Sequence, residues 1–254
     1  MLYESYVLLE MNINLQKMSL IVEALNRITT WLEKNHPQSL LTLQLRQVRE
    51  NIYSQVSDLQ LPKKTLQGVY EEDKLLFLQV SEEFDENCTL HIQLPEEFYE
   101  LYQWKNGTHY ERETVTLLDS LLFFGTYFSE LGSQHYISAK ESVYDYGVIF
   151  MFNRDEYSFV LDMIRWKLDS LQSPPLAMLW TNTEDPYREE VVFASWTSMM
   201  LTLAEALEAK VCWFDAYGDL TGDPAQLKTI HQKYNSGCEI GFSKWLDWWL
   251  GSWI

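Results

Sequence analysis

The segment Leu94–Gly107 constrains the fold of this chain more than any other stretch of its sequence. Pro95 suits the first turn of a helix, because its missing N–H would be unpaired there anyway, and Glu96 and Glu97 place negative charge at the positive end of the helix dipole. Asn106-Gly107 can adopt the left-handed conformation that ends a helix. The apolar residues of the segment recur at helical spacing, at Phe98, Leu101 and Tyr102. The segment therefore predicts a short helix, ending near Lys105, that packs one apolar face on a core.

Further helices are predicted on both sides of this segment. Apolar residues at helical spacing predict a helix over residues 15–34, which His36-Pro37 would end, and a second over residues 41–59, which Pro62 would bound. Residues 71–84 fit either a helix or a strand, because the run Leu75–Leu78 suits both. Towards the C-terminus, Ser195 is a suitable N-cap for a helix that reaches about Ala209.

The pattern changes after Gly107. Six short runs are rich in aromatic or β-branched residues and are separated by turn formers, which predicts strands at Thr114–Leu118, Leu121–Phe124, Gly147–Phe152, Tyr157–Leu161, Leu176–Trp180 and Glu190–Phe193. Helices first, strands next and a helix last indicate an α+β fold. We expect a mostly antiparallel or mixed sheet of about five or six strands, flanked by helices. Residues 1–60 form an N-terminal helical segment in this prediction, packed as a single domain with a sheet domain over 61–254.

The chain is strongly acidic. Its 37 Asp and Glu residues exceed its 19 Lys and Arg residues, which gives a net charge of −18. Nucleic acid and anionic membranes would repel such a chain, so we expect neither as a partner, whereas a basic protein would be attracted. A high net charge also simply keeps a protein soluble, which is the alternative explanation.

Cysteine usage and hydropathy favour a cytoplasmic location. The three cysteines, Cys88, Cys212 and Cys238, form no even set and no C-x-x-C pair, which is typical of a reducing compartment. The first residues lack the basic region and unbroken apolar run of a signal peptide. No apolar run approaches the roughly 18 residues that are needed to span a bilayer.

Three sequence blocks, in this order, carry a resemblance to a known superfamily. They are Trp31–Glu33 with His36-Pro37, then Leu94–Gly107, then Val192–Glu205, which is followed by Asp215–Leu220 and Lys233–Asn235. The chain is similar in these blocks to the SUKH superfamily (SMI/KNR-type domains), which includes fungal cell-wall-assembly regulators and bacterial toxin-immunity proteins. The resemblance implies an α+β fold and a role in binding proteins. Residues 41–78 are longer than the usual link of that family, and the tail over 241–254 is unusually rich in tryptophan.

The common catalytic and metal-binding motifs are missing from the sequence. It has no G-x-S-x-G, no phosphate-binding glycine loop and no H-E-x-x-H, and we expect no cofactor and no enzymatic activity. Some weaker alternatives stay open. A hydrolase could use neighbouring carboxylates, Cys88 and His91 have half of a zinc-ligand spacing, and a loose calcium loop could form around Gly218. Its oxygen ligands would come from Asp215, Asp219, Thr221 and Asp223.

Candidate partner-binding residues lie at three places in the sequence. The first is the end of the Leu94–Gly107 helix, and the second is a polar hairpin between two predicted strands, because loops on a rigid scaffold often carry binding. The third is the aromatic face of the tail, which either covers the core of the domain or presents tryptophans to a partner. The candidates are Trp104, Lys105, Asn106, Asp185, Tyr187, Glu189, Glu190, Trp248 and Trp249.

Charge and resemblance together predict a non-enzymatic protein-binding domain. Its leading form is an immunity protein that blocks a basic toxin domain through an acidic surface. A regulatory scaffold for other intracellular proteins is the alternative.

Overall fold

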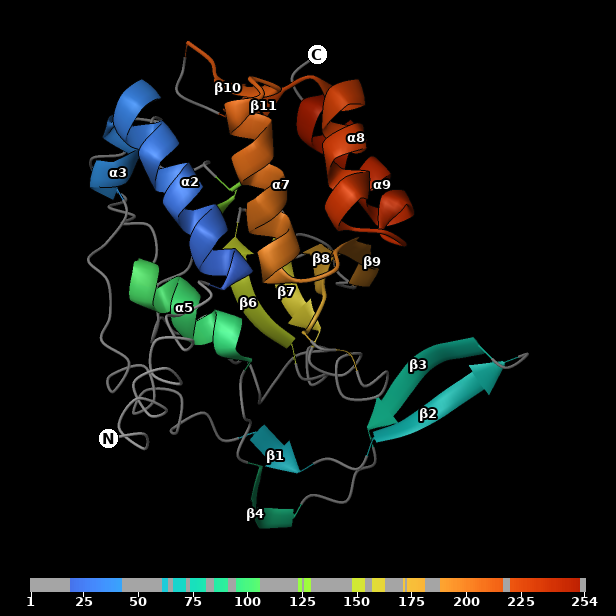
Figure 1. Ribbon diagram of the computed structural model, residues 1–254. Helices are drawn as coiled ribbons and strands as arrows, with labels where there is room; N and C mark the ends of the chain where they lie inside the picture. The colour runs from blue at the N-terminus through green and yellow to red at the C-terminus, as the bar shows by residue number, and fades with distance from the viewer. Residues whose placement is uncertain are drawn as a thin grey trace, which may run out of the picture.

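The computed structural model describes residues 19–42, 61–63, 66–71, 74–80, 85–90, 95–105, 123–124, 126–128, 148–153, 157–162, 171, 173–180, 188–216 and 220–251. Its helices are α2 (Leu20–Asn35), α3 (Gln38–Thr42), α5 (Glu96–Trp104), α7 (Trp196–Glu208), α8 (Pro224–Tyr234) and α9 (Glu239–Gly251) (Figure 1). Helices and antiparallel sheets are both present, so the chain has a mixed helix and strand structure, which is compatible with the predicted α+β class.

The longest sheet of the described chain is antiparallel. Its strands follow the order β5-β6-β7-β8-β9, and they are β5 (Tyr127–Phe128), β6 (Val148–Asn153), β7 (Tyr157–Asp162), β8 (Leu176–Trp180) and β9 (Arg188–Phe193). The remaining strands pair two by two, and they are β1 (Leu61–Lys63) with β4 (Asp85–Leu90), β2 (Leu66–Glu71) with β3 (Lys74–Val80), and β10 (Cys212–Phe214) with β11 (Leu220–Gly222).

The register between β8 and β9 is irregular. Phe193 lies opposite Leu176 and Val191 lies opposite Ala177, so Val192 is an extra residue in β9. A second shift follows further along the same pair of strands. Bulges of this kind bend an edge strand and re-aim its backbone groups, and here β9 is the last strand of its sheet. The bulge at Val192 comes shortly before the turn into α7, and contacts at this turn hold the helices on the sheet.

Most sequence-based predictions of elements agree with the structure. The predicted helices correspond to α2, α5 and α7, and four of the predicted strands correspond to β6, β7, β8 and β9. The ambiguous run Leu75–Leu78 lies in a strand, β3, because it pairs with β2 in a hairpin. Of the helix predicted over 41–59, residues up to Thr42 belong to α3 and the rest lies outside the described residues. The helix α8 was not predicted.

Two details of the prediction need correction. Pro95 is the N-cap of α5 with extended backbone, φ −66° and ψ 152°, and not a residue of the first turn, so the helix begins at Glu96. Phe123 and Phe124, expected in a strand, form a tight turn in which the Thr126 hydroxyl donates to the Phe123 carbonyl. Phe124 has a positive φ of 53°, which lies outside the β region of regular strands. The strand predicted at Thr114–Leu118 lies outside the described residues.

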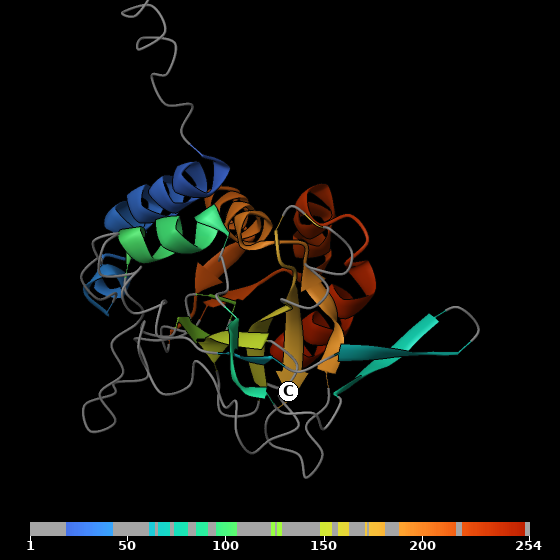
Figure 2. The same cartoon turned by 90° about the horizontal axis from the view of Figure 1, so that it is seen from below.

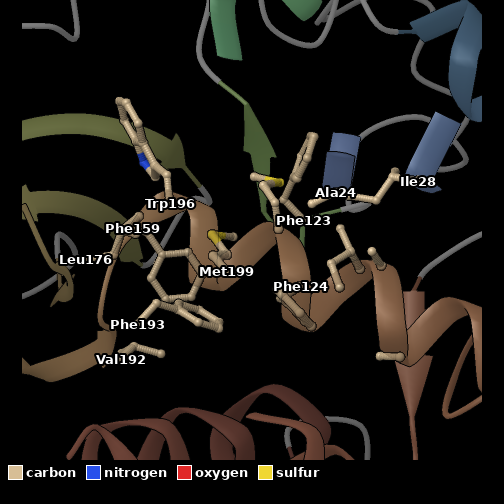
Figure 3. Close-up of a cluster of buried hydrophobic side chains, with 14 of the residues drawn as sticks. Ala24, Ile28, Phe123, Phe124, Phe159, Leu176, Val192, Phe193, Trp196 and Met199 are labelled. Carbon is tan, nitrogen blue, oxygen red and sulfur yellow. The ribbon is translucent and has the colours of Figure 1, made fainter. Parts of the chain in front are cut away.

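The hydrophobic core joins the helices to the five-stranded sheet. α7 packs against α2, α5, α8 and β9, and α9 packs against β8 and β9. Figure 1 shows α2, α7 and α8 side by side, with the sheet beneath them. Figure 3 shows the centre of this core, where Trp196 and Met199 of α7 lie among Phe159, Phe193 and Phe124. Because α2 shares this core through Ala24 and Ile28, it is an integral layer of the fold.

The tryptophans of α9 are part of the same core. Trp245 is 0% exposed and Trp249 is 2% exposed, and their rings stack with centroids 4.9 Å apart. Trp245 also meets Phe159 of β7 edge to face. Of the two interpretations of the aromatic tail, the structure therefore supports core packing for Trp245 and Trp249, so Trp249 presents no exposed ring to a partner. No helix in the described part of the chain is long and apolar enough to cross a membrane.

Removal of the Trp245 ring tests this role of α9. We expect Trp245→Ala to lower the free energy of unfolding by about 3–5 kcal/mol, because the indole leaves a large cavity between α9 and the sheet. Ile240→Ala on the same helix is the matched control, since Ile240 is 68% exposed, and it should change stability by less than about 0.5 kcal/mol. Urea unfolding, followed by far-ultraviolet circular dichroism of the backbone, measures the stability of both variants. Equal, small effects of the two substitutions would contradict the packing of α9 on the core.

Candidate functional site at the junction of β9 and α7

Several buried polar contacts of the described chain lie at the turn from β9 into α7. Ser195 has extended backbone and caps α7, and its hydroxyl accepts the Ser198 N–H at 3.0 Å. The Ser198 hydroxyl in turn accepts the Ser195 N–H at 2.9 Å, which completes a capping box. Serine is suited to both positions because its short side chain reaches the neighbouring backbone. We call residues Val192–Ser198 the β9–α7 junction.

α5 contacts the junction through Glu97. One carboxylate oxygen, Oε2, accepts the Thr197 N–H at 3.1 Å and the Thr197 hydroxyl at 2.5 Å. The negative charge therefore lies at the positive end of the α7 dipole, where it is stabilised. The other oxygen, Oε1, is buried and accepts no hydrogen bond from the residues that the structure describes. Glu97 is thus a structural contact between α5 and α7.

The electrostatics of Glu97 reflect its position. Its side chain is 7% exposed, and this burial raises the pKa of the carboxyl group. The hydrogen bonds from Thr197 act in the opposite direction, as does the nearby Ser173 hydroxyl. The negative charge of Glu100 adds to the increase. Desolvation is the largest of these effects, so Glu97 holds a proton more strongly than an exposed glutamate does.

α8 contacts the other side of the junction through Asn235, its C-cap residue. The side chain is fully buried and uses both ends of its amide. Oδ1 accepts the Ala194 N–H at 3.0 Å, and Nδ2 donates to the Thr202 hydroxyl of α7 at 3.0 Å. Nδ2 also donates to the His231 carbonyl at 3.1 Å. A single asparagine therefore connects β9, α7 and the end of α8.

His231 contacts the strand β9 itself, two residues before Ala194. Its Nε2 lies 2.7 Å from the Val192 carbonyl oxygen, and since a carbonyl can only accept, Nε2 carries the proton. The ring stacks on Phe242 of α9 with centroids 3.6 Å apart. The residue is 1% exposed, and burial lowers the pKa of the imidazole from 6.5 to about 4, against the raising effects of the Val192 carbonyl and Glu239. His231 is therefore neutral at pH 7.

An ion-paired layer covers the outer side of α7. Arg27 of α2 forms a two-pronged pair with Glu208, with Nε–Oε1 at 2.9 Å and Nη2–Oε2 at 2.6 Å. Lys233 donates to Glu205 at 2.5 Å, and the Tyr234 hydroxyl donates to the same carboxylate. Burial would raise the pKa of Glu205, but the bonds from Lys233 and Tyr234 lower it overall. These pairs connect α2 and α8 to α7 and neutralise two of its acidic residues.

The candidate partner-binding residues that the structure describes lie in α5 and at its end, in β9 and in α9. Trp104 is half-buried, donates from Nε1 to the Thr29 hydroxyl at 2.9 Å and meets Phe123 edge to face. Lys105 is the C-cap of α5, and its N–H donates to the Leu101 carbonyl at 3.0 Å. Trp249 is buried, as described above. Of the remaining candidates, those whose backbone is described lie in β9 and α9, and they are Glu189, Glu190 and Trp248. Asn106, Asp185 and Tyr187 lie outside the described residues.

The alternative metal sites find no support in the described residues. No group of three or more His, Cys, Asp or Glu side chains is close enough to bind a metal ion in this part of the chain. Asp223, a candidate calcium ligand, is the N-cap of α8, where its carboxylate accepts the Gln226 N–H at 2.9 Å. Cys212 is a buried free thiol, and burial raises its pKa to about 12, so it is a poor nucleophile. Cys88 lies in β4, and His91 and Asp219 lie outside the described residues.

The three polar residues that contact the junction from other helices, Glu97, His231 and Asn235, were not predicted as a site. Glu97 lies four residues before Leu101, so it falls on the apolar face of its helix, and a charged residue there is a signal of a specific buried contact. Leu227, His231 and Asn235 are likewise spaced four apart on one helical face. This periodicity could have located His231 and Asn235, but only with α8 recognised as a helix.

Substitution of Asn235 tests the contact between α8 and the junction. We expect Asn235→Ala to lower the free energy of unfolding by about 2 kcal/mol, because the Ala194 N–H and the Thr202 hydroxyl lose a buried partner. Gln232→Ala, an exposed position of the same helix, is the control and should be nearly neutral. Chemical denaturation measures the two variants. A neutral Asn235→Ala would show that these bonds do not hold the junction.

The pH dependence of stability tests His231. Below pH 6.5 the unfolded chain binds a proton at this residue, whereas the folded chain does not until about pH 4. The stabilisation is therefore complete above pH 6.5 and is lost as the pH falls from 6.5 to about 4, with a maximum loss of about 3 kcal/mol. His231→Gln keeps a donor for Val192 and removes the titration. The difference in unfolding free energy between wild type and His231→Gln should shrink over that interval, and a constant difference would contradict a neutral buried imidazole.

Comparison with known proteins identifies no relative of this chain. No protein-family model matches this chain, and no curated protein is similar to it. The likeness to SUKH domains therefore depends on the three sequence blocks alone.

Proposed function

We propose that this chain is a non-enzymatic protein-binding domain of the SUKH type, and specifically an immunity protein that neutralises a cognate toxin. One observation carries the proposal, namely that three of the similar segments contact one another through their polar residues. Glu97 binds Thr197, and Asn235 binds Ala194. Trp104 also binds Thr29, which lies two residues before the first block. Residues that specify a shared fold are expected to form such contacts, because buried polar pairs allow few alternative packings.

These contacts also restrict where a partner can bind. Their side chains are buried or bound within the chain, so they are not exposed to recognise another molecule. Thr29, Glu97, Asn235 and His231 hold helices against each other or against β9. A partner protein would therefore be bound by surface residues that take no part in the packing of the core.

The charge of the chain supports a basic partner. Exposed acidic residues attract a basic surface over distances of about 10 Å and raise the association rate. Two acidic residues of α7 are already paired, and α8 and α9 together carry two acidic and three basic residues. The net charge of −18 therefore arises mainly from segments outside these helices. In this proposal the toxin-facing surface lies outside α7, α8 and α9.

Co-expression tests the function. A toxin domain encoded beside this gene should arrest growth when produced alone, and simultaneous production of this chain should restore growth. The purified pair should associate more slowly as salt is raised from 50 to 500 mM, by about tenfold or more, because the attraction is electrostatic.

Two controls accompany this experiment. A toxin inactivated at its catalytic residue should still bind, which separates neutralisation from suppression of expression. Absence of protection, combined with stable capture of a housekeeping protein, would contradict the immunity proposal and favour a regulatory scaffold instead.

A further inference from the structure

A buried carboxyl group and a pair of aromatic rings join α5 to α7. Figures 1 and 2 show the start of α5 beside the start of α7. There the Oε2 atom of Glu97 accepts the Thr197 N–H at 3.1 Å and the Thr197 hydroxyl at 2.5 Å. The neighbouring residues Phe98 and Trp196 are also in contact, with ring centroids 5.4 Å apart. Glu97 thus adds two directed bonds to an aromatic contact.

The second oxygen of this carboxyl group is buried without a hydrogen bond. The Glu97 side chain is 7% exposed, and its Oε1 atom has no partner among the described residues. An ionised carboxylate shares its charge between both oxygens, so Oε1 would then hold part of a charge with no donor beside it. Because an unpaired buried charge is costly, a carboxyl group in such a place takes up a proton instead. The geometry of the contact therefore favours the neutral form of Glu97.

The charged groups of the elements around Glu97 do not offset this cost. They are Glu96 and Glu100 of α5, Glu205 and Glu208 of α7, and Glu23, Arg27, Glu33 and Lys34 of α2. Of these, Glu100 acts on Glu97 by its charge, and a like charge opposes ionisation. Arg27 is already paired with Glu208, and Lys34 is exposed in the last turn of α2.

Two features act in the other direction. The hydrogen bonds from Thr197 and the nearby Ser173 hydroxyl favour the ionised form, as does the dipole of α7. Burial outweighs these effects, so the pKa of Glu97 in the folded chain is higher than its ordinary value of 4.5.

We propose that the α5–α7 contact is a proton-sensitive device built into the fold, in which protonated Glu97 holds α5 on α7 and loss of the proton weakens this contact as the pH rises. The response of His231 has the opposite sign, since its stabilisation is lost as the pH falls from 6.5 to about 4. Acid therefore weakens the α8 side of the junction, and a rising pH weakens the α5 side. This inference does not depend on the proposed function.

The direction of the effect follows from linkage. In the unfolded chain Glu97 loses its proton near pH 4.5, whereas the folded chain keeps it to a higher pH. The stabilisation is therefore complete below pH 4.5 and is lost as the pH rises through the pKa of the folded state. A single proton changes the folding equilibrium constant by at most about tenfold per pH unit.

A neutral replacement of Glu97 tests the proposal. Glu97→Gln has no charge at any pH and keeps an oxygen that can accept from Thr197. The folding equilibrium constant of wild type, divided by that of Glu97→Gln, should fall as the pH is raised from 4.5 to about 8, measured by urea unfolding of the full chain. Glu33→Gln, at an exposed position of α2, is the matched control, and its ratio to wild type should stay constant. A constant or rising ratio for Glu97→Gln would overturn the proposal.

Carbon-13 NMR of the Glu97 carboxyl carbon gives a second measurement. In the folded wild type its titration midpoint should lie above pH 4.5, and Glu100→Gln should move the midpoint down, because a like charge is removed. Glu33→Gln should leave the midpoint unchanged. This titration is made on the wild-type chain, so it decides the question even if Glu97→Gln does not fold. A midpoint at or below pH 4.5 would show that Glu97 is ionised in the contact and would overturn the proposal.

Discussion

Buried hydrogen bonds hold the β9–α7 junction from two sides, and the rest of this structure depends on them. Glu97 holds the first turn of α7 from α5, and Asn235 and His231 hold the end of β9 from α8. All three side chains are buried, so each bond is made where an unpaired group would be costly. The position of α7 against the sheet, and with it the core around Trp196 and Met199, follows from these contacts.

The junction connects distant parts of the chain. Glu97 and Thr197 are one hundred residues apart in sequence, and Trp104 reaches Thr29 across seventy-five. Contacts of this kind order helices that hydrophobic packing alone would allow to slide, because hydrophobic attraction has no direction. The bulge at Val192 contributes by turning backbone groups of β9 towards α8. The local structure of the junction, with its bulge, therefore favours the same arrangement as its long-range hydrogen bonds.

The sequence predicted what depends on local pattern and missed what depends on distant contacts. Regular spacing located α2, α5 and α7, and alternation or apolar runs located β6 to β9. Helix α8 escaped prediction because its apolar face consists of Leu227, Ile230 and the polar residues His231 and Asn235. Trp249 was weighed as a partner contact because spacing cannot say whether an aromatic face meets the core or the solvent. The site itself was beyond local pattern, since no rule of spacing pairs Glu97 with Thr197.

Hydrogen exchange at the Ala194 and Thr197 amides is the most direct test of the hydrogen bonds that hold the junction from two sides. These protons are donated to Asn235 and Glu97, and they are the protons that would be released first if either side opened alone. We predict that both exchange with the same opening free energy as the central amides of α7, such as that of Leu203, so that only global unfolding exposes them. Exchange of either amide at a clearly lower free energy, with the Leu203 amide still protected, would show that the junction opens on its own and would contradict its central role.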